Sequence, residues 1–288
     1  MRSQDEESEE AEDADEADEI FFLWYLLGIL GFLCLVGFLS CSSLSQYCAT
    51  MPTPTYSTRC TSHRKIAADV YEFTLAKPEG FTFKAGQFVM FQVPLVDQPS
   101  DVQNRAFSIA SAPSEPNLLF VARIKRGGRA GRWISEMLKE GDDVTFQGPL
   151  GNFTLSESGE SKLLFLATTS GIAPLRSQIV EALHRGDVRP MDLFFCVRNE
   201  EDLFWLGELE EIARRNANVH VHVSISQPSA AWKGLTGHVQ DVASRVMPDL
   251  PERSVYVCGG PEMVKSVRTK ALEEWGIPKE RIHSEDYV

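Results

Sequence analysis

An uninterrupted apolar run, IFFLWYLLGILGFLCLVGFL, occupies residues 20–39 and contains no charged side chain. A helix of about twenty residues rises about 30 Å, which matches the hydrocarbon core of a bilayer. Trp24 and Tyr25 stand near the N-terminal end of the run, where amphipathic rings favour the membrane interface. The run predicts a transmembrane anchor over residues 20–40, so we expect the globular part of the chain to follow it.

Residues 1–19 carry eleven acidic side chains and one arginine, which accounts for −10 of the formal net charge of −13. Such a segment buries too little apolar surface to fold, and it predicts a disordered acidic tail. A cleaved signal peptide would have a basic N-terminal region and a shorter apolar run, so we expect an uncleaved, single-pass anchor. The first cations after the run are Arg59, Arg64 and Lys65, and the positive-inside rule then places the globular part in the cytoplasm.

The remainder of the chain is nearly balanced in charge and lacks the basic excess that binding to a phosphate backbone requires. We therefore expect no nucleic-acid partner. The chain has six cysteines, too few and too scattered for a disulfide scaffold at this length. Residues 41–59 are rich in Ser, Thr and Pro and predict a linker, after which two domains are expected, over residues 60–158 and 159–288.

The first of these domains is expected to be an antiparallel β-barrel. Short apolar or alternating runs separated by Gly and Pro predict strands at residues 70–75, 88–93, 105–110, 118–124 and 144–147. Closely spaced strands with turn residues between them are typical of a barrel or a sandwich.

The strand at residues 105–111, RAFSIAS, carries three chemically useful side chains. The guanidinium of Arg105 can bind a diphosphate, the ring of Phe107 can lie against a planar heterocycle, and Ser108 can hydrogen-bond a ring nitrogen. Taken alone, these residues are better explained as an arginine, a core phenylalanine and a turn serine of an ordinary strand. A glycine-rich segment at residues 127–131 then opens a predicted helix over residues 132–140, whose first amides are free to bind phosphate.

The second domain alternates between strand and helix. Strands are predicted at residues 163–167, 192–197, 219–226 and 255–258, and helices at residues 174–184, 202–215, 239–246 and 261–275. This alternation predicts a doubly wound α/β sheet, in which ligands bind at the carboxyl ends of the strands. Two such ends are rich in Ser, Gly and Pro: TTSGIAP at residues 168–174 and CGGPEM at residues 258–263. These segments could equally be tight turns, since the G-x-G-x-x-G fingerprint is absent.

Five motifs in the same order resemble the ferredoxin-NADP reductase superfamily. They are the RAFS strand, the glycine-led helix, GPLGNF at residues 148–153, TSGIAP, and CGGPEM, and the RNEEDLF segment at residues 198–204 also matches. The resemblance spans roughly residues 60–288. It implies a barrel domain that binds FAD, followed by an α/β domain that binds NAD(P)H.

The resemblance also assigns roles to residues. Arg105 would hold the flavin diphosphate, Phe107 would flank the flavin, and Ser108 would hydrogen-bond near its reactive N5 atom. The other residues implied at the flavin are Ala106, Val121, Arg123, Gly128, Ala130, Gly131 and Arg132. Contact between the helix and a diphosphate favours FAD over FMN. Gly131 departs from the family, which usually has Ser or Thr there.

In the second domain, the resemblance implies that Cys258 borders the nicotinamide, with Glu285 and Tyr287 completing the catalytic group that includes Ser108. Tyr287 could cover the flavin or simply finish an edge strand. The other residues implied at the nucleotide are Thr169, Ser170, Gly171, Pro174, Arg198, Gly259 and Met263. Thr168 and Thr169 replace two glycines of the family pattern, which puts nucleotide affinity in question.

The sequence thus predicts a membrane-anchored, FAD-dependent NAD(P)H oxidoreductase that passes electrons to a separate acceptor, such as a ferredoxin, a haem protein or a membrane redox partner. Two alternatives remain. One is a flavin-binding adaptor or regulatory subunit without nicotinamide turnover, and the other is a reductase module that works only inside a larger complex. NADH and NADPH also remain alternatives, because neither an acid nor an arginine marks the ribose position near Lys233.

No metal is expected. The cysteine spacing of a plant-type iron–sulfur protein is absent, so the chain should carry no cluster of its own. His220 and His222 share one face of a predicted strand, but no Cys, Asp or Glu accompanies them at ligand spacing, and a solvated sheet face is the preferred interpretation.

Overall fold

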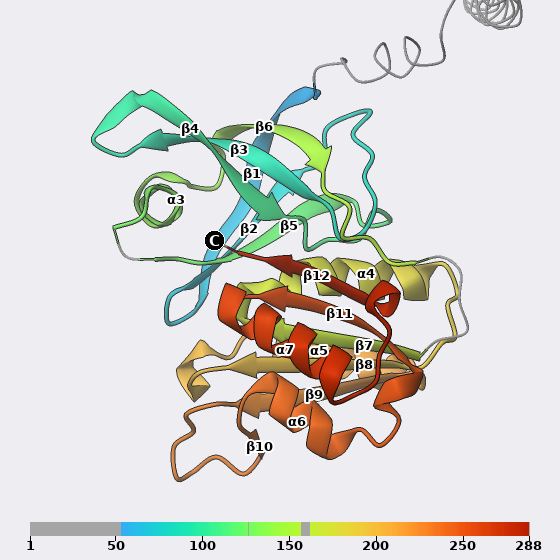
Figure 1. The fold of residues 1–288 in the computed structure, drawn as a ribbon. Coiled ribbons are helices and arrows are strands. Elements are labelled where there is room, and N and C mark those ends of the chain that lie inside the picture. The colour runs from blue at the N-terminus through green and yellow to red at the C-terminus, as the bar shows by residue number, and fades with distance from the viewer. Residues whose placement is uncertain (1–52, 126, 157–161, 288) are drawn as a thin grey trace, which may run out of the picture. The chain divides into compact units, whose positions relative to one another are not determined.

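The computed structural model describes residues 53–125, 127–156 and 162–287. The predicted acidic tail, the anchor at residues 20–40 and most of the linker lie outside the described residues. Within the described ranges, no helix is both long enough and apolar enough to cross a membrane. Residues 53–288 form one compact unit, in which a barrel lobe precedes an α/β lobe (Figure 1).

The barrel lobe is built on one antiparallel sheet of six strands in the order β4-β3-β6-β1-β2-β5. Just after β4, the amide of Ala110 donates a hydrogen bond to the carbonyl of Leu119 at 2.8 Å, so the chain returns from one edge strand to the other. The strands are β1 (Thr55–Ala67), β2 (Val70–Ala76), β3 (Phe88–Leu95), β4 (Gln98–Ser108), β5 (Asn117–Arg123) and β6 (Asp143–Leu150). The predicted antiparallel architecture is therefore confirmed.

Aromatic side chains fill this sheet's interior. Phe73, Phe91 and Phe120 are fully buried, and the rings of Phe91 and Phe120 meet edge to face with centroids 5.0 Å apart. Residues at every second position of β3 are buried, as the predicted alternation requires. Such aromatic contacts add about 0.5–1.5 kcal/mol per pair beyond the burial of their area.

Several elements in this lobe differ from the prediction: β1 was not predicted as a strand, and β4 begins at Gln98 rather than at Arg105. The first strand begins at Thr55, so residues 55–59, which the sequence places in the linker, pair with β6. The helix predicted at residues 132–140 begins earlier, as α3 (Arg129–Arg132), and continues as a π-helix over Trp133–Met137. The start of the chain's first strand is decided by pairing with β6, because Tyr56 is the only large apolar residue in Thr55–Arg59.

The α/β lobe has a parallel sheet in the order β10-β9-β8-β7-β11-β12, which confirms the doubly wound prediction. Its strands are β7 (Lys162–Thr168), β8 (Met191–Val197), β9 (Val219–Ile225), β10 (Leu235–Thr236), β11 (Arg253–Gly259) and β12 (Ile282–Asp286). Its helices are α4 (Ile172–His184), α5 (Leu206–Arg215), α6 (Val239–Val246) and α7 (Pro261–Glu273). The helix predicted at residues 202–215 is shorter, because Trp205 adopts a left-handed conformation before α5.

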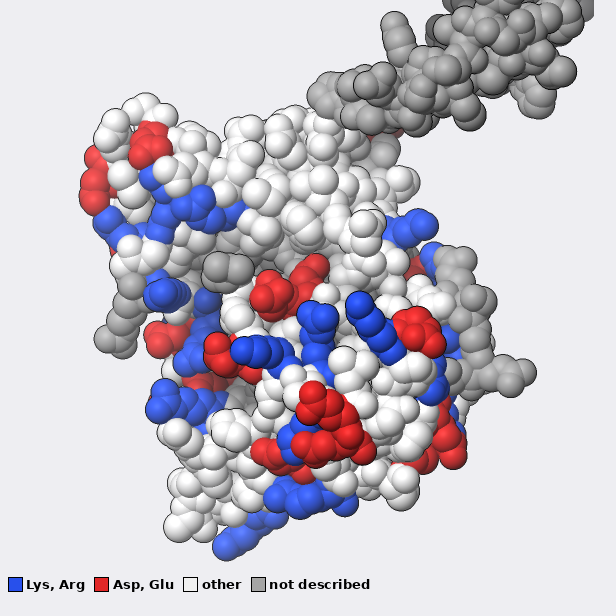
Figure 2. Space-filling model, in the orientation of Figure 1, with Lys and Arg blue, Asp and Glu red and all other residues white. Residues whose placement is uncertain are grey.

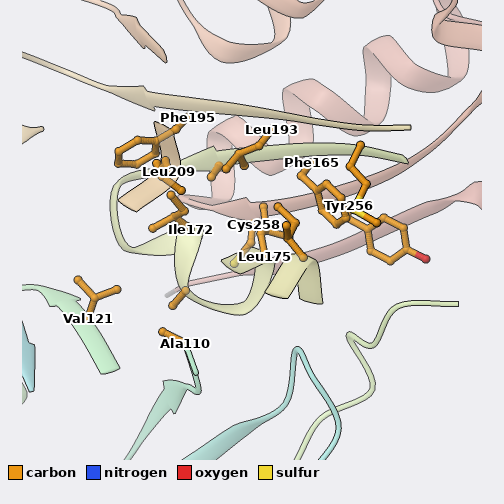
Figure 3. Packing of buried hydrophobic residues seen from close by; sticks show 14 of the residues in the cluster. Ala110, Val121, Phe165, Ile172, Leu175, Leu193, Phe195, Leu209, Tyr256 and Cys258 are labelled. Atoms are coloured by element: carbon orange, nitrogen blue, oxygen red, sulfur yellow. The ribbon is translucent and has the colours of Figure 1, made fainter. Parts of the chain in front are cut away.

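Successive residues of β7 point into different cores. Phe165 packs with residues of α4 and α5, whereas Leu164 and Leu166 pack with residues of α6 and α7. The first of these cores also contains Ala110 and Val121 from the barrel lobe. Figure 3 shows these two residues beneath the start of α4, so the two lobes share a core beside the segment after β4.

Candidate functional site

A cavity of about 400 Å³ opens where the end of β4, the end of β5 and α3 meet. Most of the residues that were predicted to hold a flavin line it. These are Arg105, Ala106, Phe107, Ser108, Val121, Arg123, Gly128, Ala130 and Gly131. Ser170 and Tyr287, which belong to the α/β lobe, line the same cavity. The cavity therefore receives residues from both lobes.

Phe107 lies between this cavity and the barrel core. Its ring meets that of Phe91 edge to face at 5.2 Å and that of Phe73 at 6.1 Å. Because these contacts hold the ring, Phe107 offers a fixed apolar wall to the cavity. The predicted core role and the predicted cofactor role are thus compatible.

The cationic side chains around the cavity are held in place differently. Arg105 donates to the carbonyl of Asn104 and to Oε1 of Gln103, both at 2.8 Å, and both contacts are exposed. Arg129, which the sequence analysis did not select, lines the cavity and pairs with Asp101 at 2.8 Å. Arg132 was selected but is not among the described lining residues, because its guanidinium pairs with Asp97 at 2.6 Å.

Gly131 is needed for close packing. A Cβ at this position would lie 2.7 Å from the carbonyl oxygen of Lys125. The Ser or Thr that the family usually carries there would therefore push α3 away from the end of β5. In this chain a backbone amide takes the place of a hydroxyl at the cavity wall.

Four side chains far apart in the sequence meet at the junction of the lobes: Ser108, Cys258, Glu285 and Tyr287. The hydroxyl of Ser108 donates to Oε1 of Glu285 at 2.9 Å and accepts from the hydroxyl of Tyr287 at 3.0 Å. The register of β11 with β12 places Cys258 opposite Glu285. Tyr287 follows β12, and its amide donates to the carbonyl of Gly259 at 3.0 Å.

Burial dominates the electrostatics of this group. It raises the pKa of the Cys258 thiol, and the Glu285 carboxylate raises it further. Burial also raises the pKa of Glu285, an effect that Asp286 increases and the hydrogen bond from Ser108 opposes. The pKa of Tyr287 is raised in the same way. The thiol and the phenol are therefore neutral at physiological pH, and both can donate hydrogen bonds without carrying charge.

A second cavity of about 410 Å³ lies at the carboxyl ends of β7, β8 and β9, next to the N-termini of α6 and α7. Of the predicted nucleotide residues, Thr169, Arg198 and Met263 line it. Arg123 lines both this cavity and the first one. The sequence analysis missed Ser226 and Gln227, although the rule that ligands bind at strand carboxyl ends could have found them.

Other predicted residues lie beneath the cavities. Gly171, Pro174, Cys258 and Gly259 are buried and are not among the described lining residues of either cavity. A Cβ on Gly171 would lie 2.2 Å from the carbonyl oxygen of Cys258. These residues therefore let the turn after β7 approach β11, and their roles toward a nucleotide stay predictions.

The turn after β7 is strained. Thr169 adopts φ +49, a left-handed conformation that is costly for a β-branched residue. Thr168, in contrast, has an ordinary extended conformation with φ −123. The strain falls at one of the two positions where the family pattern has glycine.

The histidine pair is less exposed than predicted. His220 is exposed, but His222 is half-buried, stacks on Phe194 at 4.3 Å and shares a 2.8 Å hydrogen bond with Asp192. Asp192 is thus a carboxylate partner that the sequence spacing did not reveal. No group of three possible metal ligands is found among the described residues.

Charge is unevenly distributed on the surface. Figure 2 shows basic and acidic side chains interspersed over the α/β lobe, whereas the centre of the barrel lobe on this face is largely uncharged.

A larger cavity of about 580 Å³ lies at the C-terminal end of α4 and contains none of the predicted site residues. The candidate functional residues therefore line the cavities of about 400 and 410 Å³ instead.

Comparison with known proteins matches two family models to the chain. An oxidoreductase FAD-binding domain covers residues 57–155, and an oxidoreductase NAD-binding domain covers residues 165–269. Ferredoxin–NADP reductase B of Sorangium cellulosum is 32% identical over 240 residues, which span 81% of this chain and 97% of that protein.

The reductase component of phenol 2-monooxygenase from Pseudomonas sp. strain CF600 is 33% identical over 195 residues, or 66% of this chain and 54% of that protein. The crystal structure of a ferredoxin NADP⁺ reductase from Neisseria gonorrhoeae with bound FAD and NADP shares the fold with a TM-score of 0.69. It is 21% identical, and the match covers 82% of this chain and 99% of that one.

Proposed function

This chain belongs to the ferredoxin-NADP reductase superfamily, and we propose that it acts as a membrane-anchored reductase that passes electrons from NAD(P)H through FAD to a separate acceptor. Its two domains make it an FAD-dependent NAD(P)H reductase. One observation carries the proposal. The α/β lobe delivers Ser170 and Tyr287 into the flavin-side cavity, beside Ser108.

The residues around the first cavity suit FAD. Arg105 and Arg129 offer guanidinium groups that can bind a diphosphate, and the close fit of Gly131 keeps the backbone of α3 at the wall. Phe107 supplies an apolar ring face against which part of a flavin ring system could lie. When bound, FAD supplies the ability to accept a hydride from a nicotinamide and to release the electrons to a second partner.

The chain's own residues orient and shield this chemistry. Ser108 is held between Glu285 and Tyr287, so its hydroxyl has a fixed position at the end of β4. Tyr287 lines the cavity from the α/β side, where its ring would help to exclude water from a bound flavin. Cys258, at the end of β11, is neutral and fully buried, and it would border a nicotinamide bound near Tyr287.

Arg123 connects the two cavities because its residue lines both. A guanidinium in this position can bind an anionic group of either cofactor. Arg198 also lines the second cavity, and its Nε donates to Oε1 of Gln227 at 3.0 Å. We propose that these two arginines bracket the diphosphate of NAD(P)H.

The anchor and the location remain part of the proposal. We propose a single-pass membrane protein whose reductase part lies in the cytoplasm. The charge-free run at residues 20–39 supports the anchor, and the cations that follow the run support the orientation. The acceptor is proposed to be a ferredoxin, a haem protein or an oxygenase component. This is supported by relatives that are named ferredoxin–NADP reductase and reductase component of a monooxygenase.

Anaerobic reduction tests the proposed activity. The purified full-length protein, loaded with FAD, is mixed under nitrogen with NADH and separately with NADPH while the visible flavin absorbance is followed. Prompt bleaching by either nucleotide is expected. A protein that stays yellow with both would support the flavin-binding adaptor instead, for which the strained Thr169 at the nucleotide turn is the favouring observation. A protein that binds no FAD would contradict both functions.

A further inference from the structure

The N-terminal half of α4 is fastened to the barrel lobe by side chains that neither cavity uses. The hydroxyl of Ser177 donates to the carbonyl of Ser111 at 2.6 Å, and Nε2 of Gln178 donates to the carbonyl of Phe153 at 2.6 Å. All of these groups are buried. Helix α4 therefore contacts both the segment after β4 and the segment after β6.

Arg176 is the most connected of these side chains. It is 7% exposed, and its guanidinium binds both oxygens of the Glu115 carboxylate, at 2.8 and 3.0 Å. The same group donates to the carbonyl of Ala110 at 2.8 Å and to Glu208 at 2.7 Å, and it lies over the ring of Trp205. Glu115 belongs to the barrel lobe, whereas Glu208 lies on α5 of the α/β lobe.

The groups joined by Arg176 lie close in the chain to Ser108 and Ser170, which line the first cavity. Ala110 stands two residues after Ser108, and α4 begins directly after the turn that contains Ser170 and Gly171. A shift of Arg176 relative to Glu115 would therefore move the turn at Ser170 relative to the hydroxyl of Ser108. Neither Glu115 nor Glu208 is among the described residues that line the two cavities.

Arg176 favours the charged form of Glu115. Burial by itself would raise the pKa of Glu115. The hydrogen bond and the charge of Arg176 outweigh this effect and hold the pKa below its ordinary value. The amide of Ala112 also donates to Glu115, which ties the carboxylate to the loop after β4. A bidentate pair between a buried guanidinium and a half-buried carboxylate restricts both the distance and the angle between its partners.

We propose that Arg176 is a positioning residue for this reductase, which sets the distance between the flavin and the nicotinamide through its bidentate contact with Glu115. The inference rests on the proposed function, because it concerns the geometry of the same hydride transfer. Transfer rates depend steeply on such geometry, and a misplacement of about 1 Å can cost about 100-fold. The contact with Glu208 stays within one lobe and has no part in this positioning.

The test compares two variants that each remove one negative partner of the same guanidinium, Glu115→Gln and Glu208→Gln. Arg176→Met is unsuitable, since it would leave both carboxylates without their cation and could prevent folding. The full-length protein, loaded with FAD, is reduced under nitrogen by the nucleotide that bleaches the wild type. Three quantities are measured: the limiting rate of bleaching, its half-saturating nucleotide concentration, and the long-wavelength charge-transfer absorbance of the reduced protein saturated with oxidised nucleotide.

For Glu115→Gln we expect the limiting rate to fall about tenfold or more, within the range that such misplacement produces. The half-saturating concentration should stay within about twofold and the charge-transfer absorbance should weaken, since that band reports stacking of the two rings. Glu208→Gln should match the wild type in all three, although both variants melt at a lower temperature. Equal behaviour of the two variants in rate and absorbance would overturn the role of Arg176. A wild-type protein that does not bleach would instead overturn the proposed function.

Discussion

The carboxyl group of Glu285 occupies an unusual place for a charged side chain. It accepts a hydrogen bond from Ser108 and faces the buried Cys258 across the β11–β12 pair, with Tyr287 and Asp286 beside it in the chain. Because burial raises its pKa in the folded protein, the folded state binds a proton more tightly than the unfolded state. Stability from this group is therefore present at low pH and is lost as the pH rises from 4.5 through the raised value.

Glu285→Gln should remove this cost and keep an acceptor for Ser108. We expect the melting temperature of the variant to exceed that of the wild type at pH 8, and the advantage to shrink toward pH 5 as the wild-type carboxyl becomes protonated. Thermal unfolding of the FAD-loaded protein at both pH values measures this. A difference that is the same at pH 5 and pH 8 would show that the Glu285 carboxyl does not titrate in that range.

At the scale of the element, the sequence predicts well those helices and strands whose apolar residues recur with a clear helical or strand period. The residues of α6 and the strand at β2 match their predicted ranges closely, because each carries a complete apolar face. Strand β1 was missed, since Thr55–Arg59 has only one large apolar residue, Tyr56, and pairing with β6 decides the conformation there. The π-helix Trp133–Met137 was missed for a similar reason, because local propensity does not encode its wider turn.

In the candidate site, too, some residues lie in motifs that the sequence shows, whereas others are brought together only by the tertiary structure. Ser108 and Cys258 sit in recognisable local motifs, and the parallel pairing of β11 with β12 then explains why Glu285 joins them. The pair of Arg176 with Glu115 had no such signal, because single charges on a helix and in a loop resemble solvated surface residues. Only the tertiary structure shows that they meet, 61 positions apart in the chain.

The turn between β7 and α4 permits a matched test of backbone strain. A left-handed conformation costs an L-residue about 1–2 kcal/mol, whereas glycine costs about 0.5–1 kcal/mol through the entropy of the unfolded chain. Thr169→Gly should therefore raise the free energy of unfolding by up to about 1 kcal/mol, because it relieves φ +49. Urea unfolding measures the change.

The neighbouring residue provides the control. Thr168 has an extended conformation that any residue adopts, so Thr168→Gly should lower the free energy of unfolding by about 0.5–1 kcal/mol. The two substitutions delete the same atoms at adjacent positions but should have opposite signs. If both lower stability equally, the conformation of Thr169 carries no strain.

At the scale of the whole molecule, the two lobes share one hydrophobic core. Ala110 and Val121 of the barrel lobe pack in the same cluster as Ile172 and Leu175 of the α/β lobe (Figure 3). Val70 of the barrel lobe also belongs to this cluster. Consecutive domains of a chain usually meet through smaller and more polar contacts and move relative to one another. A shared core instead predicts that neither lobe is stable without the other.

Residues 53–288 should consequently unfold in one cooperative step. Scanning calorimetry of this segment with FAD bound is expected to give a single peak, with equal calorimetric and van't Hoff enthalpies. The double variant Ser177→Ala with Gln178→Ala removes two buried hydrogen bonds between the lobes and leaves the carbonyls of Ser111 and Phe153 without these donors, at about 1–3 kcal/mol each. The calorimetric transition of this variant should broaden or split, because the lost free energy comes from the contact between the lobes.

Two separate peaks in the unaltered protein would mean that the barrel and α/β lobes fold independently, and that α4 joins them without coupling them.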